Sequence, residues 1–187
     1  MAQKRKDWNG LISGFKASDL VFLDESGCNT DMTRRYAYSL GGSRAVDSAP
    51  LSKPTNTTIL SSIQLDGTLH YTTFSGGTTV EKFKQYLKTD LLPHLNGDSV
   101  LVMDNMKSHH AKAVKNLLDS SGVRYIYLPP YSPDLNPIEK LWSKVKAFLR
   151  KFKARTLDAL PNAIQNAFHS VTVSDCSGWF RFCGYVL

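Results

Sequence analysis

Residues 100–142 read VLVMDNMKSHHAKAVKNLLDSSGVRYIYLPPYSPDLNPIEKLW, and this stretch decides the fold. The apolar runs at 99–103 and 123–128 have the length of buried strands, and residues 111–118 between them repeat apolar side chains at helical spacing. This order of strand, helix and strand predicts an α/β domain. An acidic residue, Asp104, directly follows the first run.

A loop with four prolines in nine residues, 129–137, follows the second predicted strand. Proline fixes φ, so this backbone is stiff before anything binds to it. Pro137 suits the first turn of a helix, and Asn136 is a candidate N-cap. Glu139 then stands on the first helical turn, separated from Asp104 by 34 residues.

The helix predicted over residues 138–153 has two different faces. At 100° per residue its apolar side chains gather on one face, which must be the core side. They are Leu141, Val145, Phe148, Leu149 and Phe152. Glu139 falls on the other face, in line with Lys146, Arg150 and Lys153. This outer face is therefore basic, and it is either solvated surface or a contact for a polyanion.

Toward the N-terminus, the apolar run 20–23 ends in Asp24-Glu25-Ser26-Gly27, which predicts a strand followed by a turn, with Asp24 at the strand's exit. Residues 28–56 are irregular, and such a segment in a compact domain is usually functional. The other predicted elements are a hairpin over 57–65 and 69–74, helices over 78–92 and 156–168, and an aromatic-rich tail. The full order predicts a mixed sheet with helices on both faces.

Each of the three acids has an ordinary structural explanation when it is taken alone. Asp24 and Asp104 are common residue types for turns at strand ends, and Glu139 is favoured by the helix dipole. If the two strands are parallel neighbours, however, their carboxylates emerge at the edge where α/β folds place ligands. Three carboxylates gathered there repel one another unless a cation holds them, and oxygen ligands suit Mg²⁺ or Mn²⁺. Two such ions about 3.5–4 Å apart are a known device for displacement at phosphate.

The composition is that of one folded domain of 187 residues. A net charge of +7 and a pI near 9.3 favour a polyanionic partner such as nucleic acid. Three cysteines match neither a zinc pattern nor a disulfide framework, which predicts reduced thiols in a cytosolic protein. His109 and His110 lack the clustered ligands of a zinc site, so we favour a polar active-site contact for His109 over a surface position. No apolar run approaches the length of a membrane span.

Three runs together resemble a known family: VFLDESG at 21–27, VMDNMKSHH at 102–110 and LPPYSPDLNPIEKLW at 128–142. They closely resemble the catalytic domain of insertion-sequence transposases of the mariner-type superfamily, which carry an Asp, Asp, Glu triad. The resemblance implies a ribonuclease H-like fold with a mixed five-stranded sheet. It also implies that Asp24, Asp104 and Glu139 hold two Mg²⁺ ions, for which Mn²⁺ can substitute.

Members of this family cut double-stranded DNA at transposon ends and join the freed 3′-hydroxyl to target DNA, so the resemblance implies DNA as partner and a homo-oligomer on it. Asn105 and His109 match the signature that follows the second acid, and Asn136 belongs to the loop signature. We infer that these three side chains position the triad. Lys146, Arg150 and Lys153 would hold the DNA backbone near the metals, as phosphate contacts do without reading sequence.

The predicted domain organisation is a linker or lead-in over residues 1–18 and the catalytic domain over 19–187. Transposases of this family carry helix-turn-helix modules ahead of the catalytic domain, whereas 23 residues precede Asp24 here. A split reading frame, with a separate chain supplying those modules, and a decayed element are both open. A catalytically inactive DNA-binding remnant is the alternative function, and a general ribonuclease H-like nuclease would share the metals without explaining the proline-rich loop.

Overall fold

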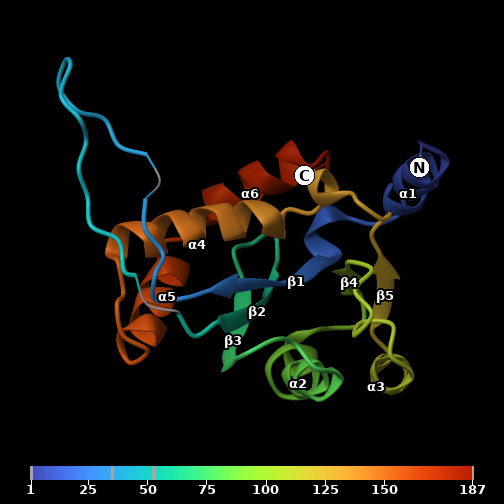
Figure 1. Ribbon diagram of the computed structural model, residues 1–187. Helices are drawn as coiled ribbons and strands as arrows, with labels where there is room; N and C mark the ends of the chain where they lie inside the picture. Colours follow the sequence, from blue (N-terminus) through green and yellow to red (C-terminus); the bar gives the residue numbers. More distant parts are fainter. Residues whose placement is uncertain (1, 35, 52–53, 187) are drawn as a thin grey trace.

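The computed structural model describes residues 2–34, 36–51 and 54–186. At its centre lies a five-stranded sheet in the order β3-β2-β1-β4-β5 (Figure 1). The strands are β1 (Leu20–Cys28), β2 (Thr57–Ile63), β3 (Leu69–Ser75), β4 (Val100–Met103) and β5 (Arg124–Tyr127). β1, β4 and β5 run parallel to one another, whereas β2 is antiparallel to both of its neighbours. The predicted α/β class and mixed five-stranded sheet are confirmed.

Strand β1 is longer than the sequence indicates. A turn was expected at Asp24-Glu25-Ser26-Gly27, but the strand continues to Cys28, so Asp24 lies inside it rather than at its exit. The continuation pairs with β2 through Cys28 and Thr57, whereas the pairing with β4 stops at Leu23. The antiparallel partner therefore overrides the local turn preference of these residues.

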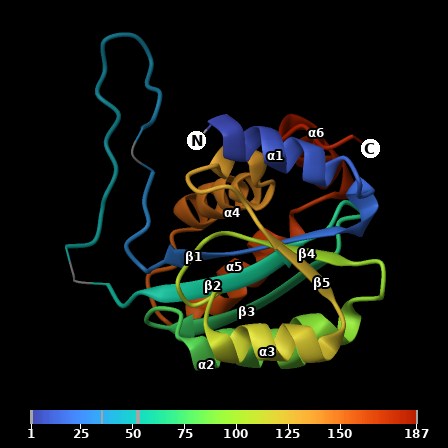
Figure 2. The ribbon, with the colours of Figure 1, turned by 90° about the vertical axis from the view of Figure 1, so that its right-hand side faces the viewer.

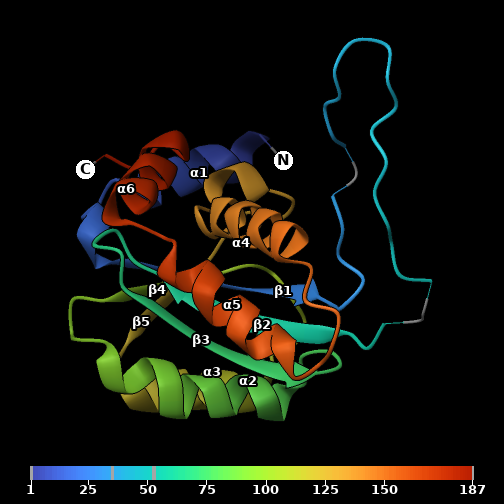
Figure 3. The same cartoon turned by 90° about the vertical axis from the view of Figure 1, so that its left-hand side faces the viewer.

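Helices cover both faces of the sheet, as predicted. Figures 2 and 3 show α2 and α3 on one face and α1, α4, α5 and α6 on the other. The helices are α1 (Ala2–Ile12), α2 (Val80–Tyr86), α3 (Lys112–Ser121), α4 (Ile138–Phe152), α5 (Ala159–His169) and α6 (Val173–Phe182). A π-helical turn, η2 (Leu87–Leu91), extends α2, and the short 3₁₀ turns are η1 (Ala17–Asp19), η3 (Leu92–His94) and η4 (Pro133–Leu135).

Alternate residues of β1 belong to two different hydrophobic cores, one on each face of the sheet. Leu20 and Phe22 pack on the side of α4, α5 and α6, while Val21 and Leu23 pack on the side of α2 and α3. Successive side chains of a strand point to opposite faces of the sheet. Asp24 therefore points to the same face as Leu20 and Phe22, and Glu25 points to the same face as Val21 and Leu23. In β4, Val102 likewise packs on the side of α4 and Met103 on the side of α2 and α3, and Asp104 follows just beyond the end of this strand.

The N-terminal segment differs from the predicted linker. Residues 2–12 form α1, and Trp8 in this helix is 4% exposed within the core that also contains Tyr185. The sequence shows only a weak apolar face here, and Leu11 on that face is half-exposed. A single buried tryptophan anchors the helix instead, which helical periodicity does not reveal.

Helix α4 matches its prediction except at the two ends. Asn136 does not cap it with its side chain; its backbone carbonyl accepts the N–H of Glu139, and Pro137 occupies the N-cap position. At the other end Lys153 adopts a left-handed conformation (φ 57°), so it leaves the helical face on which it was predicted. Phe152 was predicted to face the core but is 46% exposed.

Between β1 and β2 the chain leaves the body and returns as an extended arm, residues 29–56 (Figure 1). Its described residues contain no helix or strand, as predicted from the irregular sequence. Large side chains of the arm, including Tyr36, Tyr38 and Leu51, are almost completely exposed. Near its base, Arg155 donates hydrogen bonds to the carbonyls of Thr30 (3.0 Å) and Met32 (3.1 Å).

All three cysteines, Cys28, Cys176 and Cys183, are free and buried. Within the described ranges, every helix is too short or too polar to cross a membrane.

Candidate active site

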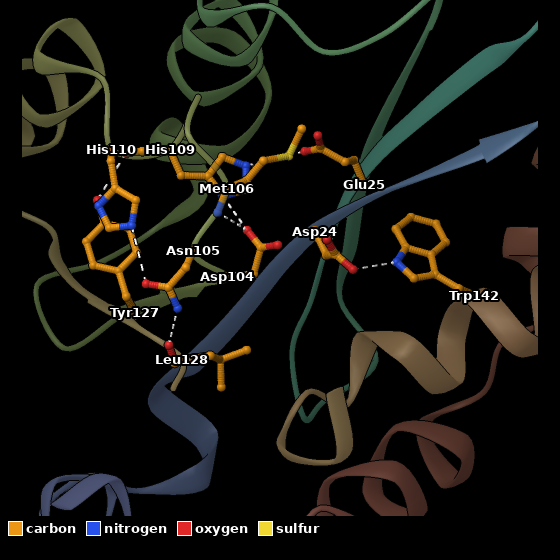
Figure 4. A network of polar contacts seen from close by, with 10 residues as sticks. All are labelled: Asp24, Glu25, Asp104, Asn105, Met106, His109, His110, Tyr127, Leu128 and Trp142. Carbon is orange, nitrogen blue, oxygen red and sulfur yellow. Dashed lines mark hydrogen bonds and ion pairs between the residues drawn. The ribbon is translucent and has the colours of Figure 1, made fainter. Parts of the chain in front are cut away.

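Two aspartates meet where the parallel strands β1 and β4 part. The register pairs Leu20 with Val100 and Leu23 with Met103, so the next residues of the two strands are Asp24 and Asp104. Both directly follow apolar residues, Leu23 and Met103, that pack on the side of α2 and α3, and Figure 4 shows the two carboxylates beside each other. The sheet therefore brings together two acids that are 80 residues apart in the chain.

Asp24 is held by α4. The indole Nε1 of Trp142 donates a hydrogen bond to Asp24 Oδ2 at 3.0 Å (Figure 4). Burial raises the pKa of Asp24 to about 7, and the negative charges of Asp104 and Glu139 add to this rise. Hydrogen bonds from the Glu25 backbone and from Trp142 offset part of it. The surroundings of Asp24 therefore favour its neutral carboxyl form over the ionised carboxylate.

Asp104 is held by the loop that follows β4. Its Oδ1 accepts the N–H of Met106 at 3.0 Å and lies 2.8 Å from His109 Nδ1, an ion-pair contact that is off the ideal hydrogen-bond direction. Burial favours a higher pKa for Asp104, but the contact with His109 and the Met106 N–H outweigh it, so the pKa is lowered. Burial by itself would lower the pKa of His109, but its contacts with Asp104 and Glu25 outweigh burial and raise the pKa to about 9.

Glu139 reaches the same place from the first turn of α4. It is exposed, and no side chain in the described part of the chain bonds its carboxylate. A cleft of about 430 Å³ is lined by all three acids and by the proline-rich loop. Arg5 of α1 donates hydrogen bonds from its guanidinium to Ser132 (3.1 Å) and Asp134 (3.1 Å) of that loop, which fixes the loop to the body.

Among the described residues, neither asparagine predicted to position the triad bonds a triad carboxylate through its side chain. Asn105 lines the cleft, but its side-chain amide donates to the carbonyl of Leu128, and its oxygen lies 3.4 Å from His110 Nε2. Asn136 also lines the cleft and is 3% exposed, with its side-chain oxygen unbonded among the described residues. Only His109 of the three contacts a triad carboxylate directly.

The three basic residues predicted to bind DNA do not form one continuous row. Lys146 lies close enough to Cys28 to oppose, by its charge, the burial that raises the pKa of that thiol to about 11. Arg150 lines an open hollow at the base of the arm together with Arg34 and Lys151. Lys153 instead binds Asp47 of the arm through both carboxylate oxygens (2.5 and 2.6 Å).

Two residues of the site were not predicted from the sequence. The sequence gives no signal for Trp142, because its indole N–H reaches Asp24 only when α4 packs on the sheet. The sequence predicts a turn at Glu25, but this residue is in β1 and its Oε2 lies 3.3 Å from His109 Nε2. The alternation of β1 is the one feature that could have placed it opposite Asp24.

Relatives of the chain are transposases. It is 29% identical over 92 residues to the Tc1 transposase of Caenorhabditis elegans, a match covering 49% of this chain and 34% of that protein. It is 31% identical over 75 residues to the Tcb2 transposase of Caenorhabditis briggsae, covering 40% of this chain and 28% of that protein. The matches thus span about a third of the length of these curated relatives.

Solved structures of Mos1 transposase share the fold. A paired-end complex of Mos1 with its left transposon end superposes with a TM-score of 0.80 at 18% identity, covering 95% of this chain and 57% of that chain. The catalytic domain of Mos1 mariner transposase superposes with a TM-score of 0.73 at 16% identity, covering 96% of this chain and 85% of that chain. At this identity the likeness shows the fold alone.

The match to a protein family covers more of this chain than the matches to the Tc1 and Tcb2 transposases do. The DDE superfamily endonuclease family matches residues 19–161, a span that begins just before β1 and contains the two aspartates and Glu139. This span is well over half of the sequence. The chain therefore belongs to the DDE superfamily endonucleases.

Proposed function

We propose that this chain is the catalytic domain of a Tc1/mariner-type transposase, which cleaves DNA strands at transposon ends and transfers them to target DNA. One observation carries the proposal: Asp24, Asp104 and Glu139, from β1, the end of β4 and the start of α4, line one cleft. Family membership and the transposase relatives support the same activity. Nicking of DNA that depends on this cleft is its direct consequence.

The cleft suits divalent cations. Among the described residues, no three His, Cys, Asp or Glu side chains are close enough to hold an ion as they stand. Each aspartate nevertheless has one oxygen held by a side chain, Trp142 for Asp24 and His109 for Asp104, and Oδ2 of Asp104 has no protein donor among the described residues. Burial is the main cause of the raised pKa of Asp24, and the negative charges of Asp104 and Glu139 add to it; a bound cation would stabilise the ionised carboxylates. Mos1 has been solved with Mg and with Mn, and we propose two Mg²⁺ ions here, with Mn²⁺ as a substitute.

The residues of the chain contribute mainly position and charge. Bound cations would activate the attacking oxygen and stabilise charge on the phosphate. Asp24 and Asp104 present their oxygens from rigid strands, and Glu139 presents its carboxylate from a helix start that Pro137 and the braced loop hold in place. Precise placement of reacting groups supplies much of the rate of such a reaction.

A purified chain tests this proposal directly. A labelled duplex carrying the element's terminal repeats is incubated with Mg²⁺ or Mn²⁺, and nicked strands are counted for the wild type and for Asp104→Ala. We expect nicking by the wild type alone, while both proteins still bind the duplex. Equal background nicking by both proteins, with DNA bound, would instead support a DNA-binding remnant.

We also propose that the chain binds double-stranded DNA through α4 and acts as a homo-oligomer on it. The net charge of +7 and the cluster of Arg34, Lys144, Arg150 and Lys151 around one hollow support a phosphate contact there. The paired-end assembly of Mos1 supports the oligomer. Helix-turn-helix modules, on a longer form of this chain or on a separate chain, would supply recognition of the transposon ends.

The double substitution Lys146→Ala with Arg150→Ala is expected to weaken DNA binding and to reduce the salt slope, d log K/d log[salt], by about 2, since each lost phosphate contact removes about 1. Fluorescence anisotropy with a labelled duplex at four salt concentrations measures the slope. Lys84→Ala with Lys88→Ala, on the α2 side of the sheet, removes the same charge and serves as the matched control. An unchanged slope in the α4 variant would remove this helix from the DNA path.

A further inference from the structure

Glu25 lies next to the site but outside the triad. It follows Asp24 in β1 and points to the opposite face of the sheet, toward α2 and α3. Its side chain is 12% exposed, and its Oε2 lies 3.3 Å from Nε2 of His109. Figure 4 shows His109 between Glu25 and Asp104.

The imidazole of His109 is tightly packed on all sides. It is completely buried and stacks on the ring of Phe83, with centroids 4.3 Å apart and planes 26° from parallel. Its backbone carbonyl accepts a hydrogen bond from the hydroxyl of Tyr127 at 3.1 Å. With the ring fixed, its two nitrogens face two carboxylates: Nε2 faces Glu25 and Nδ1 faces Asp104 Oδ1 at 2.8 Å.

This arrangement decides which oxygen of Asp104 is free. Oδ1 is occupied by His109 and by the N–H of Met106, whereas Oδ2 has no protein donor among the described residues. Asp24 shows the same division, since Trp142 occupies its Oδ2. Each aspartate of the pair thus has one oxygen held by a side chain, and in Asp104 the other oxygen is available.

The position of Glu25 is difficult to explain by stability alone. Its Oε1 is buried and unbonded within the described part of the chain. A buried polar atom without a partner destabilises the folded state. Glu25 carries this unbonded atom while its other oxygen lies beside the ring that contacts Asp104, which points to a role in supporting the site.

We propose that Glu25 is a positioning residue: through His109 it orients Asp104 so that Oδ2 is presented for a divalent cation. The cation rests on the proposed function, whereas the chain of contacts from Glu25 to Asp104 does not. Residues that support a metal ligand in this way typically change metal affinity or activity by about 10–100-fold when they are replaced.

The test measures metal binding without DNA. Mn²⁺ affinity is determined by electron paramagnetic resonance for the wild type, Glu25→Ala and Glu25→Gln, and thermal melting of each protein checks the fold. We expect Glu25→Ala to weaken Mn²⁺ binding by about tenfold or more. We expect Glu25→Gln to recover most of the affinity, since its amide oxygen can accept from Nε2 as the carboxylate does. Glu81→Ala, exposed on the first turn of α2, removes the same charge away from the site and should bind as the wild type does.

Two results would overturn the inference. One is a folded Glu25→Ala that binds Mn²⁺ as the wild type does; the other is a Glu25→Gln that melts normally yet binds as weakly as the alanine variant. Nicking assays separate this inference from the proposed function. A wild type that binds Mn²⁺ but never nicks DNA, together with weakened binding in Glu25→Ala, would overturn the proposed function and leave the positioning role supported.

Discussion

Replacing Glu139 by Gln is expected to slow DNA nicking by about a thousandfold, equivalent to about 4 kcal/mol of transition-state stabilisation. Gln keeps the size of the side chain but removes the negative charge that a divalent cation needs. The folded state should change little, because Glu139 is exposed and its carboxylate is unbonded among the described residues. Loss of a favourable helix-dipole contact costs about 0.3–1 kcal/mol. Single-turnover nicking and thermal melting measure the two effects separately.

Glu81→Gln is the matched control for this prediction. Glu81 is also exposed and also stands on the first turn of a helix, α2, so its replacement loses the same dipole contact. We expect Glu81→Gln to nick DNA at the wild-type rate. A Glu139→Gln protein that nicks as fast as this control would show that Glu139 takes no part in the chemistry.

The triad was visible in the sequence because its residues stand at the ends of clear local patterns. Asp24 and Asp104 follow apolar runs, and parallel strands place such residues at one edge. Glu139 follows a proline-rich loop, and the fixed φ of Pro137 favours a helix that begins at this point. The observed register, in which Leu23 pairs with Met103, makes Asp24 and Asp104 the next residues in line.

The supporting residues could not be predicted, because their roles depend on tertiary contacts. Asp24-Glu25-Ser26-Gly27 has the composition of a turn, and only the pairing of β1 with β2 keeps this segment extended and directs Glu25 toward His109. Trp142 is one apolar residue among several on α4, and nothing local distinguishes an indole that donates to Asp24. Long-range packing outweighs local preference at both positions.

Helical projection failed at the end of α4 for a similar reason. It treats residues 138–153 as one regular helix, but the chain turns into a left-handed conformation at Lys153. The side chain of Lys153 then pairs with Asp47 of the arm instead of extending the basic row. The arm is far from α4 in the sequence, so a one-helix projection has no access to that contact.

Asp24→Asn is expected to abolish nicking and yet to stabilise the metal-free chain at neutral pH. In the wild type, burial and neighbouring negative charges raise the pKa of Asp24 to about 7, against an ordinary value of 3.8. Between these two values the unfolded chain has released the proton while the folded chain retains it, so folding stability falls as pH rises from about 4 to about 7. The loss is roughly 2–4 kcal/mol, since one pKa unit corresponds to about 1.4 kcal/mol.

Asparagine removes this loss because it is neutral at every pH and can still accept the Trp142 N–H. At pH 8 we expect the Tm of Asp24→Asn to exceed that of the wild type by about 4–16 °C, and at pH 4 we expect the two to coincide. Millimolar Mg²⁺ should narrow the gap at pH 8, since a cation that binds only the folded, ionised wild type stabilises it. A gap that does not change between pH 4 and pH 8 would contradict the raised pKa. A gap that Mg²⁺ leaves unchanged would mean that Asp24 does not bind the cation. Melting at two pH values therefore tests the raised pKa of Asp24, and melting with and without Mg²⁺ tests its role as a metal ligand.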